Sequence, residues 1–214
     1  MARISIVGAT GYAGTALVAE AARRGHQVTA YSRTPPEQRL DGVTYISLDV
    51  LEDGAPERAV TDADVVLDTL SPRGALEGEL ERVHLELATR ADAAGVRFGV
   101  LGGAGSSLVA EGGPRVMDRP GFPAFALPEA NVAATTLDEL RQTPESLDWF
   151  MISPAASFGA HNPGETHGEY RTGGDVLVVA ADGTSSLSAG DLAIAFVDEV
   201  ERPAHRRQRF TVGY

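Results

Sequence analysis

Three glycines near the start of the chain have the spacing of a phosphate-binding turn. Gly8, Gly11 and Gly14 form the pattern G-x-x-G-x-x-G. Glycine lets a chain turn sharply as it leaves a strand, and it lets backbone approach a pyrophosphate closely. The N–H groups at the start of a following helix, with the positive end of its dipole, would then face the phosphates. The chemistry that this spacing predicts is the binding of a dinucleotide.

The segments beside these glycines are those that such a turn requires. Residues 4–7 form a short apolar run of β-branched character, which predicts a strand. Residues 13–22 are rich in Ala and Leu, which predicts a helix. Strand, glycine turn and helix in this order make a dinucleotide fingerprint credible. The spacing differs from G-x-G-x-x-G, and this difference favours one branch of the Rossmann proteins.

A cationic residue follows the next predicted strand, at residues 27–31. Ser32 and Arg33 stand there, where a Rossmann fold reads the adenosine ribose. An acidic residue would accept a hydrogen bond from the 2′-OH of NAD, whereas an Arg accommodates the 2′-phosphate of NADP. The next acidic residue is Glu37. We therefore predict that NADP(H) is preferred over NAD(H); the alternative is that Arg33 is a solvated surface side chain.

Strands and helices alternate along the rest of the chain. Further strands are predicted at 43–48, 64–70, 96–101, 148–152 and 208–212, and helices at 56–60, 76–94, 129–140 and 191–201. This alternation predicts an α/β fold, a single-domain doubly wound parallel sheet over residues 1–214. Small C-terminal elements on the substrate side would include a hairpin over 176–187 that turns at Asp182-Gly183. Ser188 and Asp191 predict a capping box for the last helix.

Ligands of such a sheet bind beyond the carboxyl ends of its strands. The loops at Gly8, Ser32, Ser71 and Gly102 all follow predicted strands, so we expect them to meet at one edge. Asp49 would lie near the adenine. The predicted cofactor-binding residues are Gly8, Thr10, Gly11, Tyr12, Ala13, Gly14, Ser32, Arg33, Asp49, Val50, Leu70, Ser71, Gly102, Gly103, Pro154 and Ala155, the last two beside the nicotinamide.

Several stretches together resemble a known family. They are the opening glycine turn, the glycine-rich run 102–106, and the C-terminal runs 170–175, 191–193 and 209–214. With them the chain resembles the atypical short-chain dehydrogenase/reductase proteins, in the NmrA-like and NADH-flavin reductase group that includes flavin and biliverdin IXβ reductases. The resemblance covers essentially the whole chain. It implies an NAD(P)-binding Rossmann fold and an NAD(P)H-dependent reductase, without naming the substrate.

The acid–base residues of typical short-chain dehydrogenases are missing. The chain has neither Lys nor Cys, which removes the Tyr-x-x-x-Lys pair, Schiff bases and thiolate nucleophiles. Phe125 and Glu129 stand near where that pair would fall. Ser106 and Ser107, after the fifth strand, are weak candidates for a catalytic residue. The usual reduction of a carbonyl group is therefore in doubt.

A flavin or a tetrapyrrole poses a simpler problem for the enzyme. Such an acceptor takes hydride into a conjugated system and can take its proton from solvent, while the cofactor supplies the hydride. The enzyme then needs an apolar shelf, for which Phe122, Phe125 and Phe158 are candidates beside their alternative role in packing. Two hypotheses remain open. One is an NADPH-dependent reductase of a flavin or similar acceptor, and the other is a non-catalytic NAD(P)-binding redox sensor.

The composition excludes some classes of binding partner. The formal net charge of −12 argues against nucleic acid and against an anionic membrane surface. No apolar run approaches the length of a bilayer span, and the chain enters a strand without a signal-peptide pattern. We expect a cytoplasmic protein that acts on a small-molecule acceptor, as a monomer or a homodimer. His161, Glu165 and His167 share one loop, but their spacing matches no zinc motif, so we predict no metal site.

Overall fold

The central strand of the fold is β1, Arg3–Val7, which precedes the glycine turn. In the computed structural model, which describes residues 1–214, β1 pairs in parallel with β2 on one side and β4 on the other. The full sheet has eight strands in the order β3-β2-β1-β4-β5-β6-β8-β7. The strand order reverses at β1 and β4, and an open α/β sheet binds its ligand beyond the strand ends at such a point.

Strands and helices alternate along most of the chain, with long connections between β5 and α4 and between β6 and α5. The strands after β1 are β2 (Gln27–Ser32), β3 (Val43–Ser47), β4 (Val65–Asp68), β5 (Arg97–Leu101), β6 (Trp149–Ser153), β7 (Arg171–Thr172) and β8 (Gln208–Gly213). The helices are α1 (Tyr12–Arg23), α2 (Ala55–Val60), α3 (Leu80–Ala94), α4 (Leu127–Leu140) and α5 (Ala189–Glu201). None of these helices has the length and apolar content that a membrane span requires.

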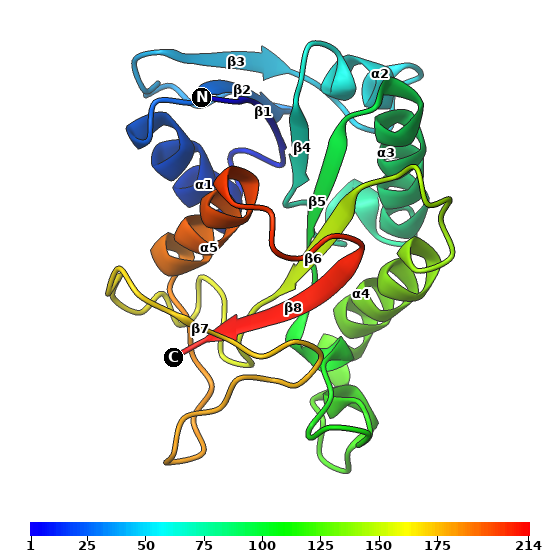
Figure 1. The fold of residues 1–214 in the computed structure, drawn as a ribbon, viewed down its shortest axis with the longest axis vertical. Coiled ribbons are helices and arrows are strands. Elements are labelled where there is room, and N and C mark those ends of the chain that lie inside the picture. The colour runs from blue at the N-terminus through cyan, green and yellow to red at the C-terminus, as the bar shows by residue number, and fades with distance from the viewer.

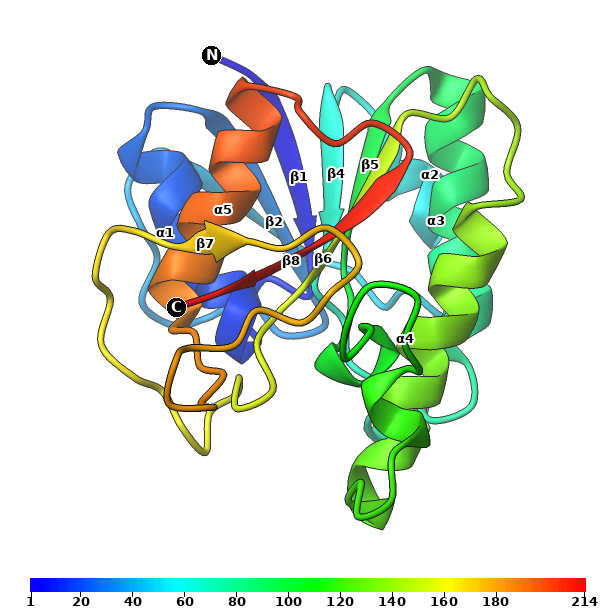
Figure 2. The same ribbon diagram turned by 60° about the horizontal axis from the view of Figure 1, so that its bottom comes forward.

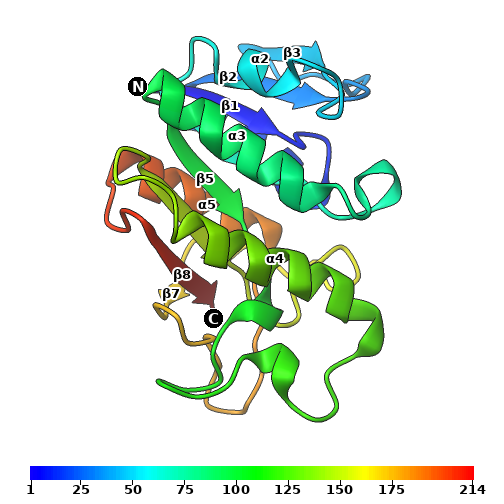
Figure 3. The same ribbon diagram turned by 90° about the vertical axis from the view of Figure 1, so that its right-hand side faces the viewer.

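Helices cover both faces of the sheet. α1 and α5 pack together on one face, and α2, α3 and α4 cover the other (Figure 1). Ile4 and Ile6 of β1 enter the apolar layer beneath α1 and α5, whereas Val7 enters the layer beneath α2, α3 and α4. Figure 3 shows α3 and α4 lying along the second face. Both sides of the central strands are therefore buried, which explains why their sequences are almost continuously apolar.

The predicted fold class is confirmed. The seven strands expected from the sequence are present and parallel, within a single α/β domain. The eighth strand, β7, has two residues, pairs antiparallel with β8, and was not predicted. The N-cap half of the predicted capping box is present, because the Asp191 N–H donates to the Ser188 hydroxyl at 3.0 Å. The reciprocal half is absent, because the Ser188 N–H donates to the Tyr214 hydroxyl at 3.1 Å.

Two helix starts differ from the prediction. The helix expected from residue 76 begins at Leu80, because Gly74–Leu76 form a separate 3-10 turn and Gly78 has a φ of +77°. A left-handed residue cannot continue a right-handed helix. The helix expected from residue 129 begins at Leu127, with Pro128 in its first turn, where the missing N–H of proline leaves no bond unmade.

The predicted hairpin over 176–187 is wrong, although its turn is right. Asp182 and Gly183 do reverse the chain, and the Ala180 N–H donates to the Thr184 carbonyl at 2.7 Å. Beyond that bond the two arms share no ladder of backbone hydrogen bonds, and the Ser185 hydroxyl links them by donating to the Val178 carbonyl at 2.6 Å. The Leu177 N–H donates to the Leu108 carbonyl at 2.9 Å, and the carbonyl of the other arm's Ser185 accepts from the loop after β6. Each arm thus pairs with a segment that is distant in sequence.

Candidate functional site

The loops that follow five strands meet at one edge of the sheet (Figure 2). Val7, the last residue of β1, lies opposite Tyr31 of β2 and Asp68 of β4. Farther along the sheet, Leu101 of β5 lies opposite Ile152 of β6. Because these strands are parallel and in register, their carboxyl ends share one edge, as the sequence predicted.

The turn after β1 has no room for side chains at two of its glycines. Gly8 has a φ of +83°, and a Cβ there would lie 2.9 Å from the Thr69 hydroxyl oxygen. A Cβ on Gly14 would lie 2.2 Å from the Gly8 carbonyl oxygen. Real Cβ atoms essentially never come within 3.0 Å of another heavy atom, and the positive φ of Gly8 further disfavours a side chain there, so both positions require glycine. The turn is therefore pressed against the start of α1 and the end of β4.

The start of α1 is open to an anion. Gly11 is the N-cap, no side chain caps the helix, and its first turn holds no acidic residue. The N–H groups of Tyr12 and Ala13 consequently find no acceptor within the chain. Free N–H groups at a helix N-terminus, together with the helix dipole, favour a bound phosphate. The residues present here fit the pyrophosphate of a dinucleotide.

A cavity of about 210 Å³ extends from this turn along the ends of β2, β3 and β4. Of the sixteen predicted cofactor-binding residues, nine line it: Gly8, Thr10, Gly11, Ser32, Arg33, Asp49, Val50, Leu70 and Ser71. Thr69 and Arg73 also line it, and sequence reasoning missed both. The sequence places Thr69 inside a strand at 64–70, but β4 ends at Asp68, so Thr69 belongs to the loop, and Arg73 lies farther along that loop.

The other seven predicted residues lie outside this cavity. Tyr12, Ala13 and Gly14 form the first turn of α1. Gly102 and Gly103 follow β5, and the buried Pro154 and Ala155 follow β6, both at the same edge of the sheet. They occupy the side of the edge where the nicotinamide half of a dinucleotide would extend.

The charged side chains that line the cavity differ in whether they already have a partner within the chain. The Arg33 side chain is exposed and enters no ion pair within the chain. Asp49 lines the same cavity, and its Oδ1 accepts a hydrogen bond from the Leu51 N–H at 3.0 Å. Arg73 lies 3.5 Å from the Glu129 carboxylate at the start of α4. Of the two arginines that line the cavity, Arg33 is therefore the one without an ion-pair partner.

The two candidate catalytic serines are buried and already hydrogen-bonded. The Ser106 hydroxyl donates to the Gly103 carbonyl at 2.9 Å. The Ser107 hydroxyl accepts from Nη1 of Arg209 at 3.2 Å, and Ser153 accepts from the same nitrogen at 3.4 Å. Neither serine thus presents a free hydroxyl at the edge of the sheet.

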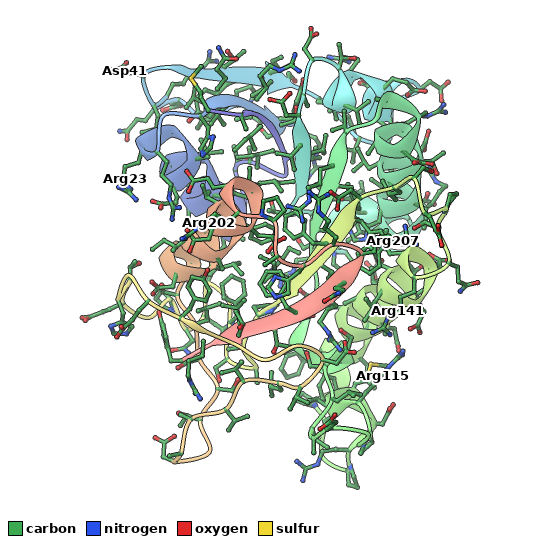
Figure 4. The ribbon with its side chains drawn as sticks, in the orientation of Figure 1. Arg23, Asp41, Arg115, Arg141, Arg202 and Arg207 are labelled. Carbon is green, nitrogen blue, oxygen red and sulfur yellow. The ribbon has the colours of Figure 1, made fainter.

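Arg209 connects Ser107 and Ser153 to a chain of ion pairs. Its guanidinium is buried in β8 and lies 2.6 Å from the Asp175 carboxylate. Burial lowers the pKa of Arg209, and Asp175 partly offsets that effect. Asp175 also pairs with Arg141 at 3.1 Å, and Asp138 pairs with Arg115 at 2.7 Å. Figure 4 shows Arg115 and Arg141 on the α4 side of the molecule. Arg209 therefore ties β8 to the loop after β5, to the end of β6 and to the segment that follows β7.

The three phenylalanines considered for an apolar shelf are not paired with one another. The Phe158 ring packs against Tyr12, with 5.3 Å between ring centroids. The Phe122 ring lies against Gly105, where a Cβ would approach it to 3.2 Å. Phe125 is 89% exposed. Phe158 thus closes the α1 side of the edge, and the other two lie in the segment before α4, on the other side of the strand ends (Figure 2).

A buried polar cluster underlies the loop after β4. The Asp68 carboxylate accepts from the Leu70 N–H at 2.9 Å, and its other oxygen lies 3.5 Å from Nε2 of His84. Nδ1 of His84 lies 2.9 Å from the Thr136 hydroxyl of α4. Burial raises the pKa of Asp68 and lowers the pKa of His84, so both groups favour their neutral forms.

The loop with His161, Glu165 and His167 holds no metal-binding cluster. Nowhere in the chain do three His, Asp or Glu side chains come together in a group that could hold a metal ion. Glu165 and His167 instead line a separate polar pocket beside α5.

A family model described as NAD(P)H-binding matches residues 8–203. The chain belongs to this NAD(P)H-binding family. The match covers both the glycine turn and the segments that form the rest of the sheet edge. A nicotinamide dinucleotide is the cofactor of this family, and the free N–H groups and the cavity have the chemistry to fit it.

Relatives of the chain share its full length. The "Uncharacterized protein YwnB" of Bacillus subtilis (strain 168) is 38% identical and covers 98% of this chain and 97% of its own. A solved structure named "Putative exported protein", from Burkholderia pseudomallei, is 38% identical, with a TM-score of 0.88 and 100% of both chains covered. A "putative NADH-flavin reductase" from Streptococcus pneumoniae TIGR4 is 31% identical, with a TM-score of 0.85. The match covers 100% of this chain and 99% of the other. One of the proteins that this chain is similar to is therefore named a putative NADH-flavin reductase.

Proposed function

We propose that the protein is an NADPH-dependent reductase that transfers hydride to a flavin or a similar conjugated acceptor, in the cytoplasm. The observation that carries this proposal is the cavity at the sheet edge. It runs from a glycine turn with free N–H groups to Arg33, a cation without an ion-pair partner. The name of the Streptococcus pneumoniae relative supports the reaction class.

The cofactor supplies the hydride, and the chain supplies its position. Tyr12 and Ala13 bind the pyrophosphate through their N–H groups, and Arg33 binds the 2′-phosphate. Pro154 and Ala155 support the nicotinamide from the end of β6. In the overall reaction NADPH is oxidised to NADP⁺, and the flavin gains the hydride and one proton. The hydroxyl of Ser106 is already bonded within the chain, so the proton comes from solvent.

The experiment that tests this function is NADPH consumption across a panel of flavins, quinones and tetrapyrroles. We expect slow oxidation with at least one soluble flavin. Replacement of Ser106 by Ala should change the rate by less than about threefold, because a general acid that acts in the transition state contributes far more. A hundredfold loss in that variant would show that Ser106 donates the proton.

The alternative function is a cofactor-binding redox sensor without turnover. One observation favours it: both serines at the edge are committed to internal hydrogen bonds, and no Tyr-x-x-x-Lys pair exists. Tight NADPH binding without oxidation by any acceptor in the panel would decide for the sensor.

A further inference from the structure

A second, polar pocket of about 350 Å³ lies beside α5. It is open on one side and is lined by the loop that follows β6, the segment that precedes α5, and Tyr214. Figure 2 shows these two segments together on the side of α1 and α5. The side chains that matter for its chemistry are Ser157, Asn162, Glu165, His167, Ser186 and Tyr214.

Hydrogen bonds fix one wall of this pocket. The N–H of Ala156 donates to the hydroxyl of Ser185 at 3.1 Å, and the N–H of Ser157 donates to the Ser185 carbonyl at 2.9 Å. The Tyr214 N–H donates to the Ser186 carbonyl at 3.1 Å. Three separate segments are thus tied into one wall, so a ligand would meet preformed walls.

Asp191 fixes a further part of the lining, formed by His167 and the Tyr214 ring. Its buried carboxylate accepts from the His167 N–H at 2.9 Å and also from the Tyr214 hydroxyl. The rings of His167 and Tyr214 meet edge to face, with 4.7 Å between centroids. This arrangement holds one aromatic face and one imidazole at defined places in the pocket.

The lining has the chemistry of a site for a neutral polyhydroxylated group. The Glu165 carboxylate is exposed and enters no ion pair, and the Asn162 amide donates to the Ser157 carbonyl at 3.0 Å while its oxygen has no donor. A free carboxylate and a free amide oxygen accept hydrogen bonds from hydroxyls, and an aromatic ring packs against a carbon chain. No Arg lines the pocket to pair with an anion.

The pocket is joined to the cofactor turn. The Tyr12 hydroxyl, at the first residue of α1, donates to the Pro163 carbonyl at 3.0 Å, and the Phe158 ring packs on the same tyrosine. Ser157 lies only three residues beyond Pro154, which we place beside the nicotinamide. An acceptor whose ring system stacks on the nicotinamide would therefore extend its substituent toward this pocket.

We propose that this pocket binds a polyol, and that its occupant in the reaction is the ribityl chain of an unphosphorylated flavin. This inference rests on the proposed function. It adds that riboflavin is a better acceptor than FMN, because the terminal phosphate of FMN would approach the free carboxylate of Glu165.

Flavin fluorescence titrations test the proposal without any turnover. The probes are riboflavin, FMN, and lumiflavin, which carries a methyl group in place of the ribityl chain. Riboflavin should bind about tenfold more tightly than lumiflavin and FMN, the size expected of one charge-assisted hydrogen bond. In Glu165→Gln the preference for riboflavin over FMN should shrink at least threefold. Glu169→Gln is the matched control, since Glu169 is an exposed acid of the same loop outside the pocket.

A second arm distinguishes the source of the polyol. Free ribitol should raise the melting temperature of the parent but not of Glu165→Gln if the pocket serves a free polyol. The proposal is overturned if riboflavin binds no more tightly than lumiflavin and ribitol gives no stabilisation that depends on Glu165. Failure of the proposed function gives another result: riboflavin still binds with dependence on Glu165, but NADPH is not oxidised.

Discussion

Gly14 packs so closely against Gly8 that a Cβ on Gly14 would lie 2.2 Å from the Gly8 carbonyl oxygen. The contact joins the first turn of α1 to the loop that leaves β1. Gly14→Ala must therefore move the helix or the turn, and we expect it to cost about 1–3 kcal/mol of unfolding free energy and to weaken NADPH binding at least tenfold. Urea denaturation and cofactor titration measure the two effects.

Gly11 offers the matched comparison, because its role is the approach of the ligand. A Cβ there would meet only the Gly8 carbonyl oxygen, at 3.2 Å, and the φ of Gly11 is −73°. Gly11→Val should therefore fold, yet lose NADPH binding, because the branched side chain occupies the space of the pyrophosphate. A folded Gly11→Val protein that binds NADPH as tightly as the parent would show that the glycine turn does not hold the cofactor.

Asp191 should make the stability of the protein depend on pH. Burial opposes ionisation of its carboxylate, but hydrogen bonds from Tyr214, the His167 N–H and Ser188 outweigh burial and hold its pKa below the usual range. A lowered pKa stabilises the folded state above the unfolded pKa of about 4, and this stabilisation is lost as the pH falls through the folded pKa.

Asp191→Asn should consequently lose about 1–3 kcal/mol of unfolding free energy at pH 7, and the difference from the parent should shrink below about pH 4. Urea denaturation at several pH values measures it. The control is Asp41→Asn, an exposed residue at the edge of the molecule (Figure 4), which should match the parent throughout. A difference between Asp191→Asn and the parent that stays constant down to pH 3 would contradict the role of the ionised carboxylate.

The sequence predicted those features that have a local signal. The glycine turn, the parallel strands and the cap at Ser188 each depend on residues within a few positions of one another, and the structure has all three. The shared edge of the sheet also followed, because parallel strands place their carboxyl ends together.

Contacts between distant residues could not be predicted in this way. Arg209 pairs with Asp175, 34 positions earlier, and His84 meets Thr136, 52 positions later. The hairpin failed for the same reason, since Leu177 pairs with Leu108 and not with the facing arm. The polar pocket likewise joins three segments, none of which carries a binding motif by itself.

Asp68→Asn should keep or increase the stability of the protein. Because burial raises the pKa of Asp68, the folded state favours the protonated carboxyl, and its contribution to stability falls as the pH rises above about 4. An amide retains the bond from Leu70 and can donate to Nε2 of His84. We expect unfolding free energy at pH 7 equal to the parent or about 1–2 kcal/mol higher. A loss of more than 2 kcal/mol would show that Asp68 and His84 form an ion pair instead.

The choice between NADPH and NADH tests Arg33 most directly. The chain carries a net charge of −12, so its mean field opposes the more highly charged cofactor, and a cation must act at short range to reverse that preference. A charge-assisted contact with the 2′-phosphate contributes about 1.5–3 kcal/mol, which is roughly one to two decades in affinity. NADPH should bind more tightly than NADH by about that factor, and Arg33→Ala should remove most of the difference while it leaves NADH nearly unchanged.

The control for Arg33 is Arg39→Ala, which removes the same charge from the same segment. Arg39 lies over the Tyr45 ring, 5.8 Å from its centroid, and does not line the cavity. If Arg33 acts by contact, Arg39→Ala should keep the preference for NADPH within about threefold of the parent, because an exposed charge farther away is screened by salt. Titration of both cofactors into the three proteins measures this. Equal affinities in the parent, or an equal loss of both cofactors in Arg33→Ala, would show that Arg33 does not read the 2′-phosphate.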